Sequence, residues 1–301
     1  MMKKSIWRIF MILLTVSCSI RAVAQQKTSP IILDSCSVQR FIPLVVENGK
    51  QSREGYTFSY RLVYPKALRS GDRQQFKKVL DLYKSKIFSP TAARETSILR
   101  SIEKEIEIEF QSYKKSALET YQEEKKEAKS DEPMYFLCFE STREVMVRET
   151  EGNFCCFQIN NMDYWGGAHG MYGTYPLLFD LSTLEQIQNK TLFRPGFEKQ
   201  LNAIVKDCAL IQMIKNRQKN APALSAEERS DLESRDVKAH DIFYLDKKGI
   251  TYVYNPYEIA SYAEGLIEVF VPFDRVRALL KPGVLKHYFP HKYDQNNRPI
   301  R

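Results

Sequence analysis

Two spacings of apolar residues between residues 56 and 121 constrain the fold of this chain more than any other feature of the sequence. In the first stretch, every second position is apolar, as in a half-buried β-strand: Tyr56, Phe58, Tyr60, Leu62 and Tyr64. Asp72 then precedes a stretch with a period of about 3.6, which runs from Phe76 to Ile87. A longer stretch of helical spacing follows from Ile98 to Tyr121. The sequence therefore predicts a strand and then two helices.

The rest of the chain predicts several strands and then a mixture of helices and strands. Strands are expected at 134–140, 143–150, 154–159 and 175–181, and the short turns between them imply antiparallel pairing. Beyond these lie a helix that begins at Phe197, a capping box at Ser225–Glu228, strands at 241–245, 250–254 and 266–271, and a helix that begins at Pro272. The predicted fold class is α+β, with antiparallel sheets and helices packed on one face, in two sequential parts.

A charged run, Glu123–Pro133, separates these two parts. We assign residues 25–132 to an N-terminal α+β domain and residues 133–290 to a C-terminal α+β domain. The basic, proline-bearing end, residues 291–301, is expected to be a flexible tail.

The N-terminus, residues 1–24, has the composition of a secretory signal peptide. Lys3 and Lys4 precede an apolar run, and Ala22–Ala24 forms an A-x-A cleavage site before Gln25. A rival processing site is Cys18, which follows small residues in the manner of a bacterial lipobox, although Thr stands where Leu is usual. We favour cleavage after Ala24, which predicts a periplasmic or secreted protein. Lipid attachment through Cys18 is the alternative.

The charge of the exported chain is mild. The formal net charge falls from +8 to +4 when the signal is removed, because its four basic residues are lost and 41 of the 45 basic residues remain against 37 acidic ones. Such a balance predicts no nucleic-acid partner. After signal removal no segment approaches the roughly 18 continuous apolar residues of a membrane-spanning helix, so no transmembrane segment is expected.

Cysteine usage permits a disulfide but does not indicate a metal site. Five cysteines remain after signal removal: Cys36, Cys138, Cys155, Cys156 and Cys208. In an oxidising compartment we expect Cys138 to pair with Cys155 or Cys156 if their strands are neighbours. No C-x-x-C spacing occurs, so neither a zinc site nor a thioredoxin-like site is predicted.

The stretch Asn160–Tyr175 concentrates glycines and aromatic residues around one histidine, His169. Glycine permits positive φ and close backbone approach, so the stretch predicts a shaped loop. His169 lacks a second ligand at metal-binding spacing and a nucleophile motif, so we predict no catalytic residue, metal or cofactor and interpret its ring as a partner of the turn. The alternative is an envelope hydrolase that uses His169 with Asp163 or Glu258.

A second aromatic stretch, Tyr252–Gly265, is rich in tyrosine. Its tyrosines either cap the core or present a recognition surface, and both interpretations stay open at this point. If the two stretches are adjacent, the candidate ligand-binding residues are Tyr164, Trp165, Gly166, Gly167, His169, Tyr172, Tyr257, Glu258 and Tyr262.

These two stretches also carry a resemblance. Tyr164–Gly170, Phe179–Leu181, Tyr257–Gly265 and Ile267–Pro272 together resemble the extracytoplasmic domain of the anti-sigma factor RsiV, a domain also found beside polysaccharide deacetylase domains. The strand and helix within Tyr60–Phe88 resemble the smaller domain that commonly precedes it. The resemblance covers nearly all of the chain after the signal.

The resemblance implies an α+β envelope protein, and in RsiV itself the domain binds lysozyme. It carries over no catalytic residue. In contrast to RsiV, we expect no cytoplasmic sigma-binding segment and no retained transmembrane helix here, which removes the anti-sigma role, and we also expect no deacetylase domain. The predicted function is a non-enzymatic binding protein of the bacterial envelope, whose partner is a lysozyme-like protein or a peptidoglycan fragment.

Overall fold

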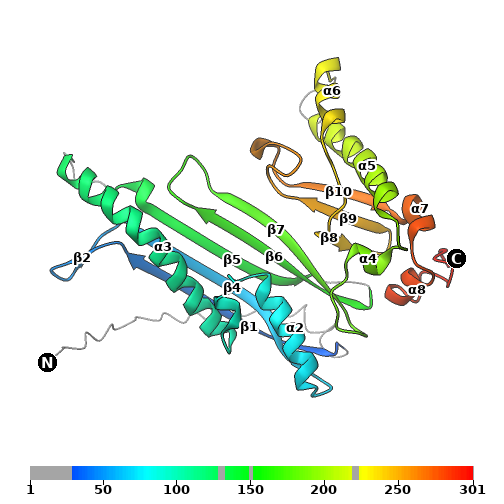
Figure 1. Ribbon diagram of the computed structural model, residues 1–301, viewed down its shortest axis with the longest axis horizontal. Helices are drawn as coiled ribbons and strands as arrows, with labels where there is room; N and C mark the ends of the chain where they lie inside the picture. The colour runs from blue at the N-terminus through cyan, green and yellow to red at the C-terminus, as the bar shows by residue number, and fades with distance from the viewer. Residues whose placement is uncertain (1–28, 128–132, 149–151, 219–223, 301) are drawn as a thin grey trace.

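The computed structural model describes residues 29–127, 133–148, 152–218 and 224–300 (Figure 1). The expected signal peptide and Cys18 lie outside the described residues. Within them the chain combines a large sheet, a small sheet and helices, so the predicted α+β class is confirmed.

The large sheet has five strands in the order β1-β4-β5-β6-β7. These strands are β1 (Ile31–Pro43), β4 (Gly55–Leu68), β5 (Cys138–Arg148), β6 (Phe154–Tyr164) and β7 (Met171–Asp180). All neighbours pair antiparallel except β4 and β5, which are parallel because two helices connect them. A two-stranded tip, β2 (Val46–Glu47) and β3 (Lys50–Gln51), joins β1 to β4.

Two helices cover one face of this sheet (Figure 1). They are α2 (Arg73–Ser85) and α3 (Ile98–Glu127), with a 3-10 turn at Ala92–Arg94 between them. The predicted cap of α2 is confirmed, since the Asp72 carboxylate accepts a hydrogen bond of 2.9 Å from the Gln75 amide. The inward side chains of both helices share one core with the sheet, including Tyr83, Phe110 and Phe157.

The C-terminal half forms a second layer around a three-stranded sheet in the order β10-β9-β8. Its strands are β8 (Phe243–Leu245), β9 (Gly249–Tyr254) and β10 (Ile267–Pro272). Its helices are α4 (Asn189–Leu192), α5 (Glu198–Gln218), α6 (Ala226–Ser234), α7 (Phe273–Val276) and α8 (Val284–Tyr288). Short 3-10 turns lie in this half at Tyr262–Glu264 and Arg277–Leu279, and another lies just before β5 at Tyr135–Leu137. The predicted capping box of α6 is confirmed.

Strand β6 belongs to both cores, because successive side chains of a strand point to opposite faces. Phe154 and Cys156 enter the C-terminal core, whereas Cys155 and Phe157 enter the helix-covered core. The large sheet thus takes strands from both sides of the expected boundary at residues 132–133. Periodicity within each segment does not reveal this, because β4 pairs with β5 through residues far apart in the sequence, such as Gly55 with Cys138, and such pairing depends on tertiary packing.

Two other expectations differ from the structure. Cys156 lies opposite Arg148, whereas Cys138 begins β5, roughly 30 Å away at about 3.3 Å per residue. A disulfide needs Cα atoms less than about 7 Å apart, so Cys138 and Cys156 cannot pair even though their strands are neighbours. Neighbouring Cys155 is equally remote from Cys138, and the cysteines of the described ranges are free thiols.

The expected flexible tail is also ordered over residues 291–300. Asn297 is buried; its side chain accepts from the Leu285 amide (2.9 Å) and donates to the Lys281 carbonyl (2.8 Å). Tyr293 is buried as well, and its hydroxyl donates to the Lys247 carbonyl. The tail therefore satisfies backbone groups of the C-terminal layer, which its composition does not indicate.

Candidate functional site

The glycine-rich stretch forms the tip of the β6–β7 hairpin, between Tyr164 and Met171. Gly166 has φ +75°, and a Cβ on it would lie 1.9 Å from the Phe136 carbonyl oxygen. A side chain at Gly167 would meet no atom within 4 Å. Only the first of these glycines is therefore required by the backbone, where it lets the tip lie against residues that precede β5.

The second aromatic stretch leaves β9 in a compact turn. The Tyr257 amide donates to the Ala260 carbonyl at 2.9 Å, and the Glu258 carboxylate accepts from the Asn255 amide at 2.8 Å. Tyr257 has φ +72°, as does Gly265, which ends the 3-10 turn Tyr262–Glu264. We refer to residues 255–265 as the tyrosine loop.

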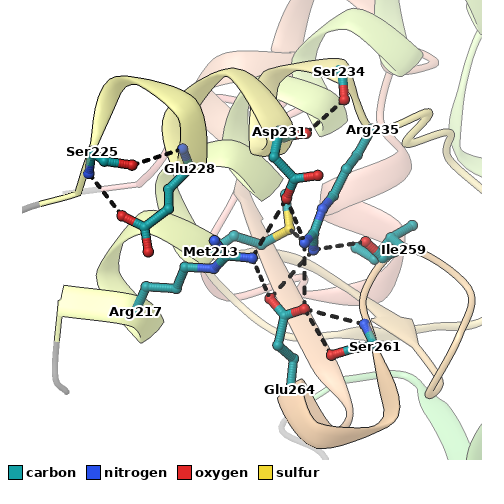
Figure 2. Close-up of polar contacts among 10 residues, drawn as sticks. All are labelled: Met213, Arg217, Ser225, Glu228, Asp231, Ser234, Arg235, Ile259, Ser261 and Glu264. Carbon is teal, nitrogen blue, oxygen red and sulfur yellow. Dashed lines mark hydrogen bonds and ion pairs between the residues drawn. The ribbon is translucent and has the colours of Figure 1, made fainter. Parts of the chain in front are cut away.

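An ion-pair network holds the tyrosine loop against α5 and α6 (Figure 2). The Arg235 guanidinium donates to the Ile259 carbonyl (3.0 Å), to Glu264 (3.3 Å) and to Asp231 (3.0 Å). Arg217 lies 3.4 Å from the same Glu264 carboxylate. Burial raises the pKa of Glu264, but hydrogen bonds from Ser261 and Arg235 outweigh it and leave the pKa below its ordinary value. Charge-assisted hydrogen bonds from Arg217 and Arg235 thus hold the tyrosine loop in position.

The tyrosine loop also contacts the hairpin directly. The Tyr262 hydroxyl donates to the Gly170 carbonyl at 2.7 Å, and its ring stacks on His169 with centroids 3.8 Å apart. Asn255, which is buried, accepts from the Thr174 amide at 2.7 Å. The two stretches are therefore adjacent, and Asn255 is a linking residue that the sequence analysis did not single out.

Four of the candidate residues form one cluster of rings, which we call the tyrosine cluster: His169, Tyr172, Tyr257 and Tyr262. The Tyr262 ring lies 5.7 Å from Tyr172 and 5.8 Å from Tyr257, measured between centroids. Tyr257 is 59% exposed and Tyr172 is 37% exposed. The cluster thus combines fixed positions with accessible aromatic surface.

The other candidates lie apart from this cluster. Trp165 is 57% exposed and contacts the hydroxyl of Tyr56, which packs on the helix-covered face of the sheet. Tyr164 is half-buried at the end of β6. The Glu258 carboxylate is engaged by the loop's own backbone. The hairpin tip therefore presents its aromatic residues in two directions.

His169 is exposed, and its Nδ1 lies 3.1 Å from the Gly170 carbonyl oxygen. Asp163, an acid considered for a hydrolase, instead accepts hydrogen bonds from Arg143 (2.6 Å) and Ser141 (2.9 Å). The His169 ring thus contacts Gly170 and Tyr262, whereas Asp163 and Glu258 are hydrogen-bonded elsewhere. Among the residues that the structure describes, no group of three or more His, Cys, Asp or Glu side chains is arranged to hold a metal ion.

A polar cluster on the helix-covered face was not anticipated from the sequence. Arg143 bridges Asp163 on β6 and Glu109 on α3, at 2.6 Å and 3.6 Å. The Tyr56 hydroxyl donates to Glu109 at 3.0 Å. Burial raises the pKa of Glu109, although the Arg143 charge opposes this shift. The sequence feature that points to this cluster is the charged Arg143, which lies two positions before Val145 and therefore on the same inward face of its strand.

Two family models match this chain. The model described as Protein of unknown function (DUF3298) matches residues 190–274, and the model described as Deacetylase PdaC matches residues 76–172. The PdaC match runs from α2 to the hairpin and so includes the expected boundary at 132–133. No curated protein matches the chain.

Solved structures share the fold. A member of the DUF3298 family from Bacteroides fragilis aligns with a TM-score of 0.69 and 22% identity, over 86% of this chain and 98% of its own. A DUF3298 family protein from Pseudomonas aeruginosa aligns with a TM-score of 0.55 and 14% identity, over 90% and 98%. Across the described ranges, no helix has the length and apolarity to cross a membrane. The chain thus contains DUF3298-like and PdaC-like segments, which indicate an extracytoplasmic protein of the cell envelope.

Proposed function

We propose that this protein is a non-enzymatic binding protein of the bacterial envelope, periplasmic or secreted, that recognises a protein such as lysozyme. The observation that carries the proposal is the tyrosine cluster. Exposed tyrosines on a fixed backbone offer large contact areas at a low entropic cost, which is the composition of energetic hot spots in protein interfaces. The resemblance to the RsiV ectodomain supplies lysozyme as the partner of choice.

The arrangement of the cluster supports binding more than hydrolysis. His169 stacks on Tyr262 and faces a backbone carbonyl, so its ring is positioned by the loop. The nearby acids Asp163 and Glu258 already have hydrogen-bonding partners of their own. A general base must reach the proton that it removes within about 3 Å or through one water, and His169 with Asp163 or Glu258 as its orienting acid is not the arrangement that these contacts describe.

Calorimetric titration with lysozyme tests the proposal. We expect saturable binding by the chain that begins at Gln25, and a loss of about 2 kcal/mol of binding free energy in Tyr257→Ala, because hot-spot truncations cost this much. Phe41→Ala is the matched control, since Phe41 is an exposed aromatic (45%) on β1, at the opposite edge of the sheet. Absence of binding, or equal losses in both variants, would overturn the proposal.

A further inference from the structure

Strand β1 is the outermost strand of the large sheet, and among the residues that the structure describes no strand pairs with its outer side. The Leu44 amide donates to the Glu54 carbonyl at 2.9 Å, and bonded and unbonded pairs alternate along an antiparallel ladder. Even-numbered residues from Leu44 back to Asp34 therefore bond β4, and the odd-numbered ones direct their N–H and C=O groups outward. We call the outward backbone groups of residues 33–41 the free edge.

The free edge is long and regular. It pairs with β4 without a register shift from Leu33 to Pro43, and residues 33–41 span about 27 Å at 3.4 Å per residue. The odd-numbered side chains from Ser35 to Phe41 are exposed. Natural proteins interrupt such edges with prolines, bulges or charged side chains, because an open edge is a template for another strand. Here the bulge precedes Leu33, so the charged side chains decide what the edge accepts.

The two charged residues of this stretch are placed symmetrically about Ser37. Asp34 lies three positions before Ser37, and Arg40 lies three positions after it. If a second copy pairs antiparallel about a two-fold axis at Ser37, Asp34 of each copy lies opposite Arg40 of the other. Both are non-hydrogen-bonded pairs, whose Cα atoms are about 4.5 Å apart and whose side chains approach most closely. Opposite charges at such positions stabilise strand pairing.

The same register also matches the other side chains by kind. It places Ser37 opposite itself, and the remaining pairs are Leu33 with Phe41, Ser35 with Gln39, and Cys36 with Val38. A shift by two residues also lets the outward groups meet, but it places Arg40 opposite Ile32 or Cys36. Either shift loses both charge pairs, so the side chains select the register centred on Ser37.

The charged residues are available to a second copy. Arg40 is half-buried and forms no ion pair with any residue that the structure describes. The Asp34 side chain is 39% exposed, although its Oδ2 lies 2.8 Å from the Lys66 Nζ. Its Oδ1 accepts a hydrogen bond of 2.9 Å from the outward amide of Ser35, which places the carboxylate at the free edge itself. The Arg40 guanidinium of a second copy would meet it there.

We propose that the free edge of β1 is a homodimer interface, in which two copies join antiparallel about Ser37 and their five-stranded sheets become one continuous sheet. The inference goes beyond the proposed function and does not depend on it. Because β7 is the opposite edge strand, the tyrosine clusters of the two copies lie toward the two outer edges of the joined sheet. The dimer therefore leaves both clusters accessible.

Oxidative cross-linking tests the register. Ser37 of the two copies forms a hydrogen-bonded pair with Cα atoms about 5.5 Å apart, which is within disulfide range. In the chain that begins at Gln25, Ser37→Cys combined with Cys36→Ser should give a covalent dimer on a non-reducing gel. Ser35→Cys in the same background is the matched control, because Ser35 is also exposed. Its counterpart in the second copy is displaced by four residues, about 14 Å, so it should not cross-link.

Sedimentation velocity over a series of protein concentrations tests the charge pairs. We expect a monomer–dimer equilibrium in the wild type. Arg40→Asp should weaken dimerisation about tenfold, because two opposite-charge pairs become like-charge pairs. Adding Asp34→Arg to this variant should restore dimerisation, since the exchange recreates both pairs. Melting temperatures of all variants verify that they are folded.

The proposal is overturned if the wild type sediments as a monomer throughout the series, or if Arg40→Asp dimerises as the wild type does. It is also overturned if Ser37→Cys cross-links no better than Ser35→Cys, which would place any dimer contact elsewhere. Lysozyme titration keeps this failure apart from failure of the proposed function. A monomer that binds lysozyme contradicts the dimer alone, and a dimer that does not bind lysozyme contradicts the proposed function alone.

Discussion

At the residue scale, Gly166 and Gly167 show how adjacent glycines differ in their role. Gly166→Ala should lower the free energy of unfolding by about 2 kcal/mol or more, because the residue has positive φ and its Cβ would overlap the Phe136 carbonyl. Gly167→Ala, the matched control, should change it by less than about 0.5 kcal/mol. Urea denaturation measures both. Equal effects would mean that the tip does not pack as described.

Asp180 gives a pH-dependent prediction at the same scale. Burial raises the pKa of Asp180, but hydrogen bonds from the Ser182 amide and from His287 (Nε2–Oδ2 2.6 Å) outweigh it, so the pKa lies below its ordinary value of 3.8. A lowered carboxyl pKa stabilises the fold above pH 3.8, and this contribution disappears as the pH falls through the folded value.

Asp180→Asn should therefore flatten the fall in stability below about pH 5, because an amide does not titrate. Urea unfolding of both proteins at several pH values between about 5 and 2 measures the slopes. His291→Gln serves as a control that leaves the Asp180 contacts in place. An unchanged slope in Asp180→Asn would show that this carboxyl does not carry the acid sensitivity.

The sequence predicted the residues of the tyrosine cluster but not which of them meet. Composition identifies Tyr257, Tyr262 and His169 as unusual, and it cannot show that Tyr262 stacks on His169 and donates to Gly170, which is 92 positions earlier. Asn255 was missed because it follows directly after β9, where a single polar residue is ordinary, and Arg143 was missed because its partners Asp163 and Glu109 come from distant segments.

At the element scale, the network around Arg235 positions the tyrosine loop (Figure 2). Arg235→Met keeps an unbranched side chain but removes the guanidinium donors. The Ile259 carbonyl and the Glu264 carboxylate then lose the hydrogen bonds that Arg235 donates to them. We expect a loss of about 1–3 kcal/mol and faster amide exchange in residues 257–265. Ser225→Ala, the control, removes the α6 cap at a cost of about 1 kcal/mol without faster exchange in the loop. Equal exchange in both variants would contradict the positioning role.

Elements with strong local periodicity were predicted well, and others were not. The strand at 56–65 and both following helices appear as β4, α2 and α3. Strand β1 was not predicted, since its exposed edge position allows many polar residues. The expected strands 134–140 and 143–150 are largely one strand, β5, in which the buried Ser141 donates a hydrogen bond to Asp163.

At the scale of the whole molecule, the shared strands β6 and β7 link the two cores. We expect one cooperative unfolding transition by circular dichroism and by fluorescence, because neither core is complete without these strands. A fragment of residues 133–290 should not fold alone, since it would expose Phe157 and Phe179 on the face that α2 and α3 cover. A cooperative melting transition in this fragment would contradict this prediction and support a domain boundary at 132–133.

The most direct test of the central claim is an amide-exchange footprint of the protein with and without lysozyme. The binding surface proposed above predicts protection of residues 164–173 and 255–265, which carry the tyrosine cluster, and unchanged exchange in β1 at the far edge of the sheet. Protection confined to other segments, or none at saturating lysozyme, would contradict it.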